Sequence, residues 1–215
     1  MSRIQRLAVV LALNIGLVAA LVAVGLAAHS LGVLAAGADC LADAAAVGVS
    51  LLAIRLAALP PSPSRPHGYR HATNIAALIN AGWLLVLYIV IGVAAVWHLA
   101  AGPHPVEGLP VLIVSAVTAV VLLAGALVLG GEPDDGPSDD GPSDGQDLNV
   151  KAVLLDTAAD SAAAAGVAIS GAIIFASGGL YWLDPATALV IALVVGYHAA
   201  KLLREVALAL RSAPG

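Results

Sequence analysis

The sequence has very little charge, and this shortage is the first feature that limits what the protein is. Only 11% of its 215 residues are Asp, Glu, Lys or Arg, whereas an ordinary soluble domain carries roughly 25%. Aromatic residues make up just 4%, while 60% of the chain is hydrophobic, much of it small Ala and Val, alongside 22 Gly. Small residues let helices approach closely within a bilayer. The composition excludes a soluble globular enzyme and predicts an all-α integral membrane protein.

Two further features exclude other interpretations. The single cysteine, Cys40, cannot form an intrachain disulfide and gives no information about the redox compartment. The net charge of −5 argues against nucleic acid as a partner. That net charge is unevenly spread, because seven of the fourteen acidic residues lie between 131 and 147.

Long apolar runs are what the sequence has in abundance. A membrane-spanning helix needs about 20 predominantly apolar residues, and six runs meet this requirement. The first run exceeds the roughly 7–15 apolar residues of a signal peptide, so it counts as a span. We expect a single transmembrane domain over residues 1–215, with six transmembrane helices at approximately 7–28, 31–58, 72–99, 108–130, 149–177 and 182–207.

The basic residues predict the orientation of these spans. Cytoplasmic loops carry an excess of Lys and Arg, whereas Asp and Glu contribute little to this rule. All nine basic residues fall at or near the two termini, the connection between spans 2 and 3, or the connection between spans 4 and 5. We therefore expect a multi-pass protein of the cell membrane with cytoplasmic N- and C-termini. The nine are Arg3, Arg6, Arg55, Arg65, Arg70, Lys151, Lys201, Arg204 and Arg211.

The connection between spans 4 and 5 has a distinctive composition. Within residues 131–147, Asp-Asp-Gly-Pro-Ser occurs twice in succession. A polar, low-complexity segment of this kind predicts a disordered acidic cytoplasmic loop. We interpret it as a solvating linker, with weak collection of cations as the alternative.

Four aspartates lie inside the expected spans, where a carboxylate is costly. Each charged side chain at the bilayer centre costs about 2.5–3.5 kcal/mol on the insertion scale, so four cost roughly 10–14 kcal/mol. A cost of this size indicates a functional use. The four are Asp39 and Asp43 in the second span, and Asp156 and Asp160 in the fifth.

The spacing of the four aspartates predicts one shared site. Residues i and i+4 lie on one face of a helix, one turn apart. Antiparallel packing of the two spans would bring Asp43 level with Asp156, near mid-membrane. Four like charges repel unless a cation or protons neutralise them, so a divalent cation and protons would compete for this site. The alternative is that the buried Asp residues only hydrogen-bond neighbouring helices. That interpretation suits a single Asp better than it suits two pairs at matched depth.

The motifs around these aspartates resemble the cation diffusion facilitator family of divalent-metal/proton antiporters. The resemblance follows the order of the family over nearly the whole chain, and it implies the fold of a cation efflux protein transmembrane domain. It also implies that the paired positions, here Asp39, Asp43, Asp156 and Asp160, coordinate the transported ion. The matching segments are 29–43, 67–80, 148–160 and Trp182-Leu-Asp-Pro185.

The chain departs from the family pattern in three ways. Zinc-preferring members usually carry His at the first position of one or both pairs, whereas both are Asp here; all-oxygen ligands favour Mn²⁺ or Fe²⁺ without excluding Zn²⁺. The usual basic and acidic residues before span 3 are replaced by His71 and Thr73, which puts an accessory site there in doubt. The family's C-terminal cytoplasmic domain is apparently lacking, so a dimer would depend on membrane helices.

The other polar residues favour structural interpretations. Cys40 points about 100° away from Asp39 and is expected to pack rather than bind metal. His67 and His71 are candidate accessory metal ligands, with a solvated loop pair as the favoured interpretation. His29, His98 and His104 are expected near the outer surface. Asp184, before Pro185, fits an N-cap of the sixth span.

Together these features predict a secondary transporter, not an enzyme. We expect it to export a divalent transition-metal ion (Zn²⁺, Mn²⁺, Fe²⁺ or Co²⁺) in exchange for H⁺, without a cofactor. Its expected partners are membrane lipid, the ions and a second copy in a homodimer. One alternative is a non-transporting metal-binding member or heteromeric partner. A more distant one is an intramembrane aspartyl protease, whose Gly-x-Gly-Asp context is absent at Gly37-Ala38-Asp39.

Overall fold

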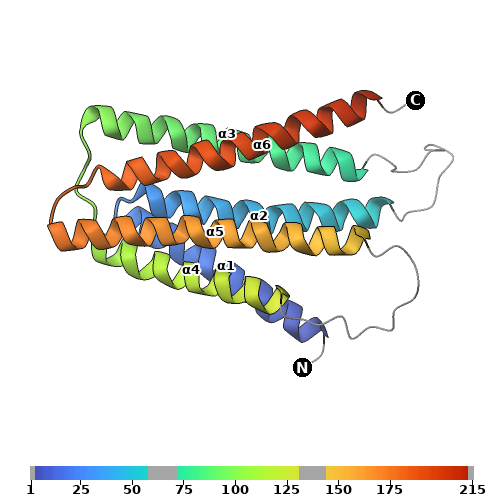
Figure 1. The fold of residues 1–215 in the computed structure, drawn as a ribbon, viewed down its shortest axis with the longest axis horizontal. Helices are drawn as coiled ribbons and strands as arrows, with labels where there is room; N and C mark the ends of the chain where they lie inside the picture. Colours follow the sequence, from blue (N-terminus) through green and yellow to red (C-terminus); the bar gives the residue numbers. More distant parts are fainter. Residues whose placement is uncertain (1–2, 58–71, 131–143, 213–215) are drawn as a thin grey trace.

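The structure is all-helical, as the sequence predicts. This computed structural model describes the backbone of residues 3–57, 72–130 and 144–212, and the side chains of residues 15–45, 48, 78–127 and 157–208. The described residues form six α-helices (Figure 1). They are α1 (Arg3–Ala27), α2 (Leu31–Ala57), α3 (Ala72–Ala101), α4 (Gly108–Gly130), α5 (Asp144–Ser177) and α6 (Leu183–Ser212).

The lengths and composition of these helices suit a membrane. Among the residues searched, four stretches are long and apolar enough to cross one, and Ile15–Ala27 is a shorter apolar helix. The four lie in α3 to α6. They are Leu78–Ala101, Gly108–Leu127, Thr157–Ser177 and Leu183–Leu208.

Helix α5 begins earlier than its apolar run. α5 begins at Asp144, so residues 144–147 of the expected acidic loop are helical. Residues 131–143, like the proline-rich segment at 59–66, lie outside the described residues.

Successive helices run in alternating directions along the long axis of the bundle (Figure 1). The start of α1 and the last residues of α6 lie at one end of the bundle. The last residues of α2 and α4 and the first residues of α3 and α5 lie there too. Short connections at 28–30, 102–107 and 178–182 close the opposite end. We call these the open end and the closed end of the bundle.

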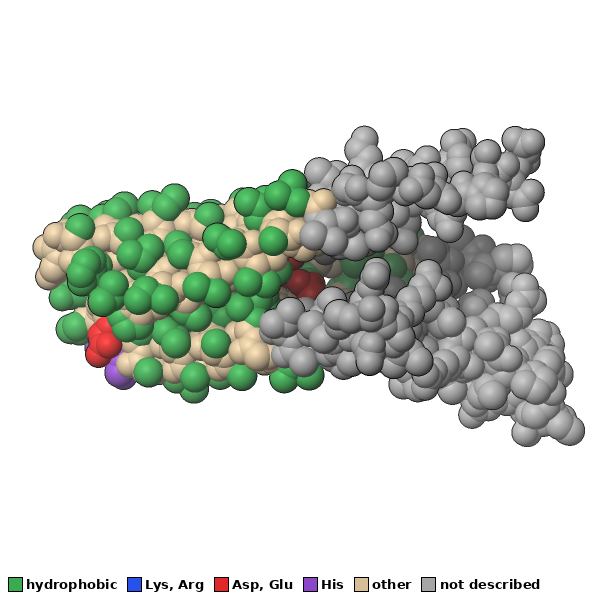
Figure 2. Space-filling model, turned by 90° about the horizontal axis from the view of Figure 1, so that it is seen from below, with side chains coloured by type: hydrophobic (Ala, Val, Ile, Leu, Met, Phe, Trp, Pro, Cys, Tyr) green, Lys and Arg blue, Asp and Glu red, His purple; other side chains and the backbone are tan. Residues whose placement is uncertain are grey.

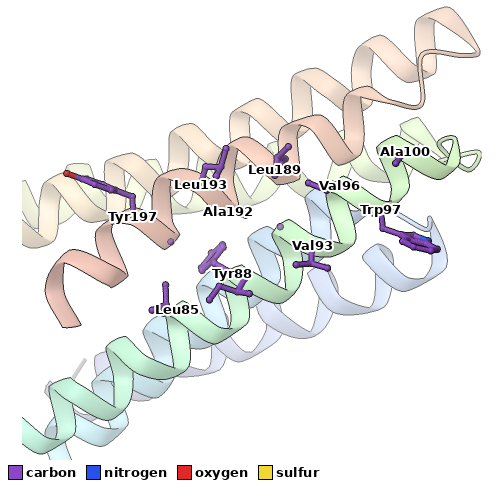
Figure 3. Close-up of a pocket in the computed structure, with 13 residues that line it drawn as sticks. Leu85, Tyr88, Val93, Val96, Trp97, Ala100, Leu189, Ala192, Leu193 and Tyr197 are labelled. Atoms are coloured by element: carbon purple, nitrogen blue, oxygen red, sulfur yellow. The ribbon is translucent and has the colours of Figure 1, made fainter. Parts of the chain in front are cut away.

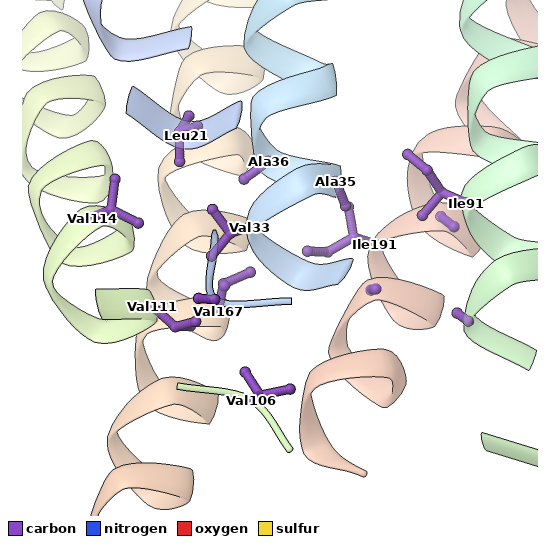
Figure 4. Packing of buried hydrophobic residues seen from close by; sticks show 14 of the residues in the cluster. Leu21, Val33, Ala35, Ala36, Ile91, Val106, Val111, Val114, Val167 and Ile191 are labelled. Atoms are coloured by element: carbon purple, nitrogen blue, oxygen red, sulfur yellow. The ribbon is translucent and has the colours of Figure 1, made fainter. Parts of the chain in front are cut away.

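Helix α2 is central to the packing. Within the described part of the chain, it is the one helix that packs against all five others, while the most extensive pairs are α4 with α5 and α3 with α6. Small residues dominate the described part of α2, including Ala35, Ala36 and Gly37, which are all buried. Figure 4 shows Ala35 facing Ile191 of α6 and Ile91 of α3, while Val33 lies near Val167 of α5.

The outer surface is apolar. Figure 2 shows hydrophobic side chains over most of the described helices, with acidic side chains visible at one end and in a recess near the middle of the view. Large apolar side chains such as Trp97, Leu127 and Tyr197 are about two-thirds exposed, at 71%, 67% and 68%. An exposed surface of this kind is suited to lipid rather than water.

Glycine permits a close helix contact between α4 and α5. A Cβ atom added to Gly108 would lie 2.7 Å from the carbonyl oxygen of Gly171, and one added to Gly171 would lie 2.7 Å from the backbone nitrogen of Leu112. Backbone atoms cannot move away as a flexible side chain can. The two helices can therefore be this close only while both positions are glycine.

We expect Gly171→Ala to destabilise the bundle by about 1–3 kcal/mol, the usual cost of overpacking. Gly166→Ala is the matched control on the same helix, because a Cβ there meets nothing within 4 Å. Thermal unfolding of the detergent-purified proteins measures the difference. Equal melting temperatures for the two variants would show that the α4–α5 contact is not tight.

Candidate metal site

Asp39 lies in the interior of the bundle. It is on the central helix α2, is only 7% exposed, and accepts a hydrogen bond of 2.6 Å at Oδ1 from the hydroxyl of Tyr88 on α3. Tyr88 is itself buried, at 2% exposure. The carboxylate therefore lies among packed helices, with at least one polar partner supplied by another helix.

Two other predicted residues lie near the same place. Asp43, one turn further along α2, and Asp160 on α5 are half-buried. Asp39, Asp43 and Asp160 all lie close enough to Tyr88 and to Cys40 to act on them electrostatically. The packing of α2 against α5 thus brings carboxylates of both predicted pairs towards one region.

The fourth predicted residue, Asp156, is one turn before Asp160 on α5, and its side chain lies outside the described residues. Among the residues that could be searched, no group of three or more His, Cys, Asp and Glu is arranged to hold a metal ion. The four-carboxylate site consequently stays a prediction. His67 and His71, the candidate accessory ligands, also lie outside the described part of the chain.

Cys40 has the surroundings of a packing residue, and three of the described histidines lie beside another ring. Cys40 is 6% exposed and belongs to the hydrophobic core. At the closed end, the rings of His98 and His104 lie 5.4 Å apart. His198 on α6 is exposed, and its ring lies 5.9 Å from that of Tyr197.

Sequence reasoning missed Tyr88. A signal was available, because a buried phenol inside a membrane span needs a hydrogen-bond partner. The partner is an aspartate at a predicted ion-binding position, 49 residues away in the chain. Which carboxylate would meet Tyr88 depends on the packing of α3 against α2.

Asp184 has a different structural role from the one expected. It follows the first residue of α6 instead of preceding the helix, and its buried carboxylate binds the N-terminus of α2. It accepts hydrogen bonds from the Ser30 hydroxyl, from Leu31 N at 2.7 Å and from Gly32 N at 3.3 Å. The Ser30 hydroxyl in turn accepts from Val33 N at 3.1 Å, which makes Ser30 the N-cap of α2.

The expectation that Asp184 caps α6 is therefore wrong, and the physical reason is clear. An anionic side chain is stabilised by the unpaired N–H groups and the positive dipole end at any helix N-terminus. The starts of α2 and α6 meet at the closed end, so Asp184 can satisfy the N-terminus of the neighbouring helix. Gly32 allows this approach, because a Cβ there would lie 3.1 Å from Asp184 Oδ1.

Comparison with known proteins places these features in a family. Residues 7–210 match the model of the cation efflux transmembrane domain. The chain is 28% identical over 178 residues to the zinc transporter ZitB of Yersinia pseudotuberculosis, covering 82% of this chain and 53% of the relative.

Two other relatives carry different names. The metal cation efflux system protein CzcD of Cupriavidus metallidurans is 31% identical over 171 residues, covering 80% of this chain and 50% of the relative. The cadmium, cobalt and zinc/H(+)-K(+) antiporter of Bacillus velezensis is 27% identical over 184 residues, covering 82% and 54%. The chain thus spans about half the length of the curated relatives it matches.

We expect Asp184→Ala to lower the thermal stability of the purified protein clearly. The change leaves the N–H groups of Leu31 and Gly32 without their acceptor, and each buried group left unsatisfied costs about 1–3 kcal/mol. Glu205→Ala is the control, an acid on the same helix whose side chain is 61% exposed and 4.0 Å from Lys201. A melting temperature for Asp184→Ala as high as that of the control would contradict the assigned role.

Proposed function

The chain belongs to the cation efflux family, and from this premise we propose that it exports divalent metal ions from the cytoplasm in exchange for protons. The family is one of cation transporters rather than enzymes. The observation that carries the proposal is the buried Asp39 on α2, with Asp43 and Asp160 acting on the same Tyr88. Carboxylates in such a place are costly unless a cation or protons compensate them.

The chemistry of the proposed site explains why export of the metal ion would be coupled to uptake of protons. Asp39, Asp43, Asp156 and Asp160 would bind the metal ion as cargo through their oxygens. When the ion leaves, the charges that it balanced would repel one another, and protons would restore the balance. The two kinds of cation would therefore occupy the site in turn, which is the basis of antiport.

The cargo that we propose is Zn²⁺ or Co²⁺, with Mn²⁺ and Fe²⁺ as alternatives. Zinc, cobalt and cadmium occur in the names of the relatives. Carboxylate oxygens accept Zn²⁺ as well as harder ions. The absence of His from the two aspartate pairs keeps Mn²⁺ and Fe²⁺ as alternatives.

We further propose that the open end faces the cytoplasm. Seven of the nine basic residues lie on described helices, towards the open end, and the excess of Lys and Arg marks the cytoplasmic side. As part of the same proposal, both termini are cytoplasmic and the protein is a homodimer in the cell membrane.

We expect Asp43→Asn and Asp160→Asn each to lower metal-driven proton flux by at least about tenfold, because each removes an anionic ligand from the site. The assay uses the full chain in liposomes that enclose a pH-sensitive dye, with Zn²⁺ added outside. Glu205→Gln is the control, since this acid is exposed on α6.

Undiminished flux in both variants would disprove the assignment of the site. If the wild-type protein binds Zn²⁺ but moves neither ion, the result favours the alternative of a non-transporting metal-binding protein.

A further inference from the structure

The hydroxyl of Tyr88 donates to Asp39 inside the bundle, and the site proposed above assigns no role to it. We propose that Tyr88 is a positioning residue that makes Asp39 bind the cargo through a single oxygen, which favours Zn²⁺ over larger ions such as Cd²⁺. The inference rests on the proposed function, because it requires Asp39 to be an ion ligand.

The hydrogen bond between Tyr88 and Asp39 is short, and both side chains are buried. The bond between the hydroxyl and Oδ1 measures 2.6 Å, and the two side chains are 2% and 7% exposed. A phenol has one hydrogen to donate, and here it is directed to Asp39. Hydrogen bonds to a carboxylate are strong, and this one restrains rotation of the Asp39 side chain.

The ring of Tyr88 also separates Asp39 from an apolar groove. Figure 3 shows this groove between α3 and α6, with Tyr88 lying between Leu85 and Ala192. Its other lining includes Val93, Trp97 and Leu193, none of which offers a charge. Since the Tyr88 ring lines the groove and its hydroxyl reaches Asp39, the ring shields the carboxylate from this apolar space.

Helix α6 lies beside the backbone end of Tyr88. A Cβ added to Gly196 would lie 3.6 Å from the Cβ of Tyr88, an ordinary van der Waals distance. Tyr88 thus belongs to α3, neighbours Gly196 of α6 and donates a hydrogen bond to Asp39 of α2. The hydrogen bond is the contact that orients Asp39.

The expected consequence is a preference among ions. An oxygen that accepts a strong hydrogen bond is a weaker metal ligand, so Asp39 would bind through one oxygen. Zn²⁺ favours four ligands at about 2.0–2.2 Å, which single-oxygen carboxylates satisfy. Larger ions take more ligands at longer distances and use carboxylates that bind through both oxygens. Removing the hydroxyl would remove this hydrogen bond from Oδ1 and improve binding of the larger ion relative to Zn²⁺.

The test compares Tyr88→Phe with Tyr197→Phe in the purified full chain. Tyr197 is the matched control because it lines the same groove but is 68% exposed. Competition between Zn²⁺ and Cd²⁺ for the protein gives the ratio of their affinities. We expect this ratio to shift towards Cd²⁺ by about tenfold in Tyr88→Phe, the effect of one hydrogen bond to a charged group, and by less than about twofold in Tyr197→Phe.

Absorption of bound Co²⁺ provides an independent measurement. Its visible bands are intense at four-coordinate sites and weak at six-coordinate sites, so we expect weaker bands in Tyr88→Phe. Unchanged bands and an unchanged ion ratio would overturn the proposal. So would an equal loss of affinity for both ions, or loss of the folded protein, because either result assigns the hydroxyl to the fold alone.

The same experiment separates this inference from the proposed function. If Asp43→Asn and Asp160→Asn abolish transport while Tyr88→Phe resembles Tyr197→Phe, only the role of Tyr88 fails. If both aspartate variants transport normally, the ion site itself fails.

Discussion

A carboxylate inside an apolar helix bundle must be compensated within that bundle, because no bulk water solvates it there. Two buried aspartates show two forms of compensation. Asp184 is compensated by the N-terminus of α2 and by Ser30, which makes it part of the scaffold. Asp39 receives a hydroxyl from Tyr88 and lies near two other carboxylates, an arrangement that protons or a metal ion would stabilise.

Both aspartates make their contacts at α2, the helix that packs against all the others in the described structure. Its buried small residues, such as Ala35 and Gly37, allow neighbouring helices to approach. Asp184 anchors its N-terminus to α6 at the closed end, while Tyr88 of α3 holds Asp39 further along the helix. The position of the proposed ion site is therefore set by contacts from several helices, and it would respond to movement of any of them.

The division between scaffold and site also explains the distribution of polarity. Leu, Val and Trp side chains cover the exterior, so lipid is the environment to which most of the surface is adapted. Among the described side chains, the buried polar groups lie at the closed end, as Ser30 and Asp184 do, and further inside the bundle, as Asp39 does. If the proposed ion site lies at Asp39 and Tyr88, it is where selection among cations would occur, because ligands shielded from water discriminate by geometry and charge.

The sequence by itself determined the membrane environment and the helices, because long apolar runs are typical of membrane-spanning segments. It also predicted a cation as cargo, because Asp residues at i and i+4 share one helix face. Those are local properties of the chain. Only the tertiary structure decided the partners of individual side chains. Asp184 has the local sequence of a cap for α6, yet its carboxylate accepts hydrogen bonds at the start of α2. Tyr88 is 49 residues from Asp39, yet donates a hydrogen bond to it. Contacts between helices depend on which faces pack together, and no local pattern of residues specifies that.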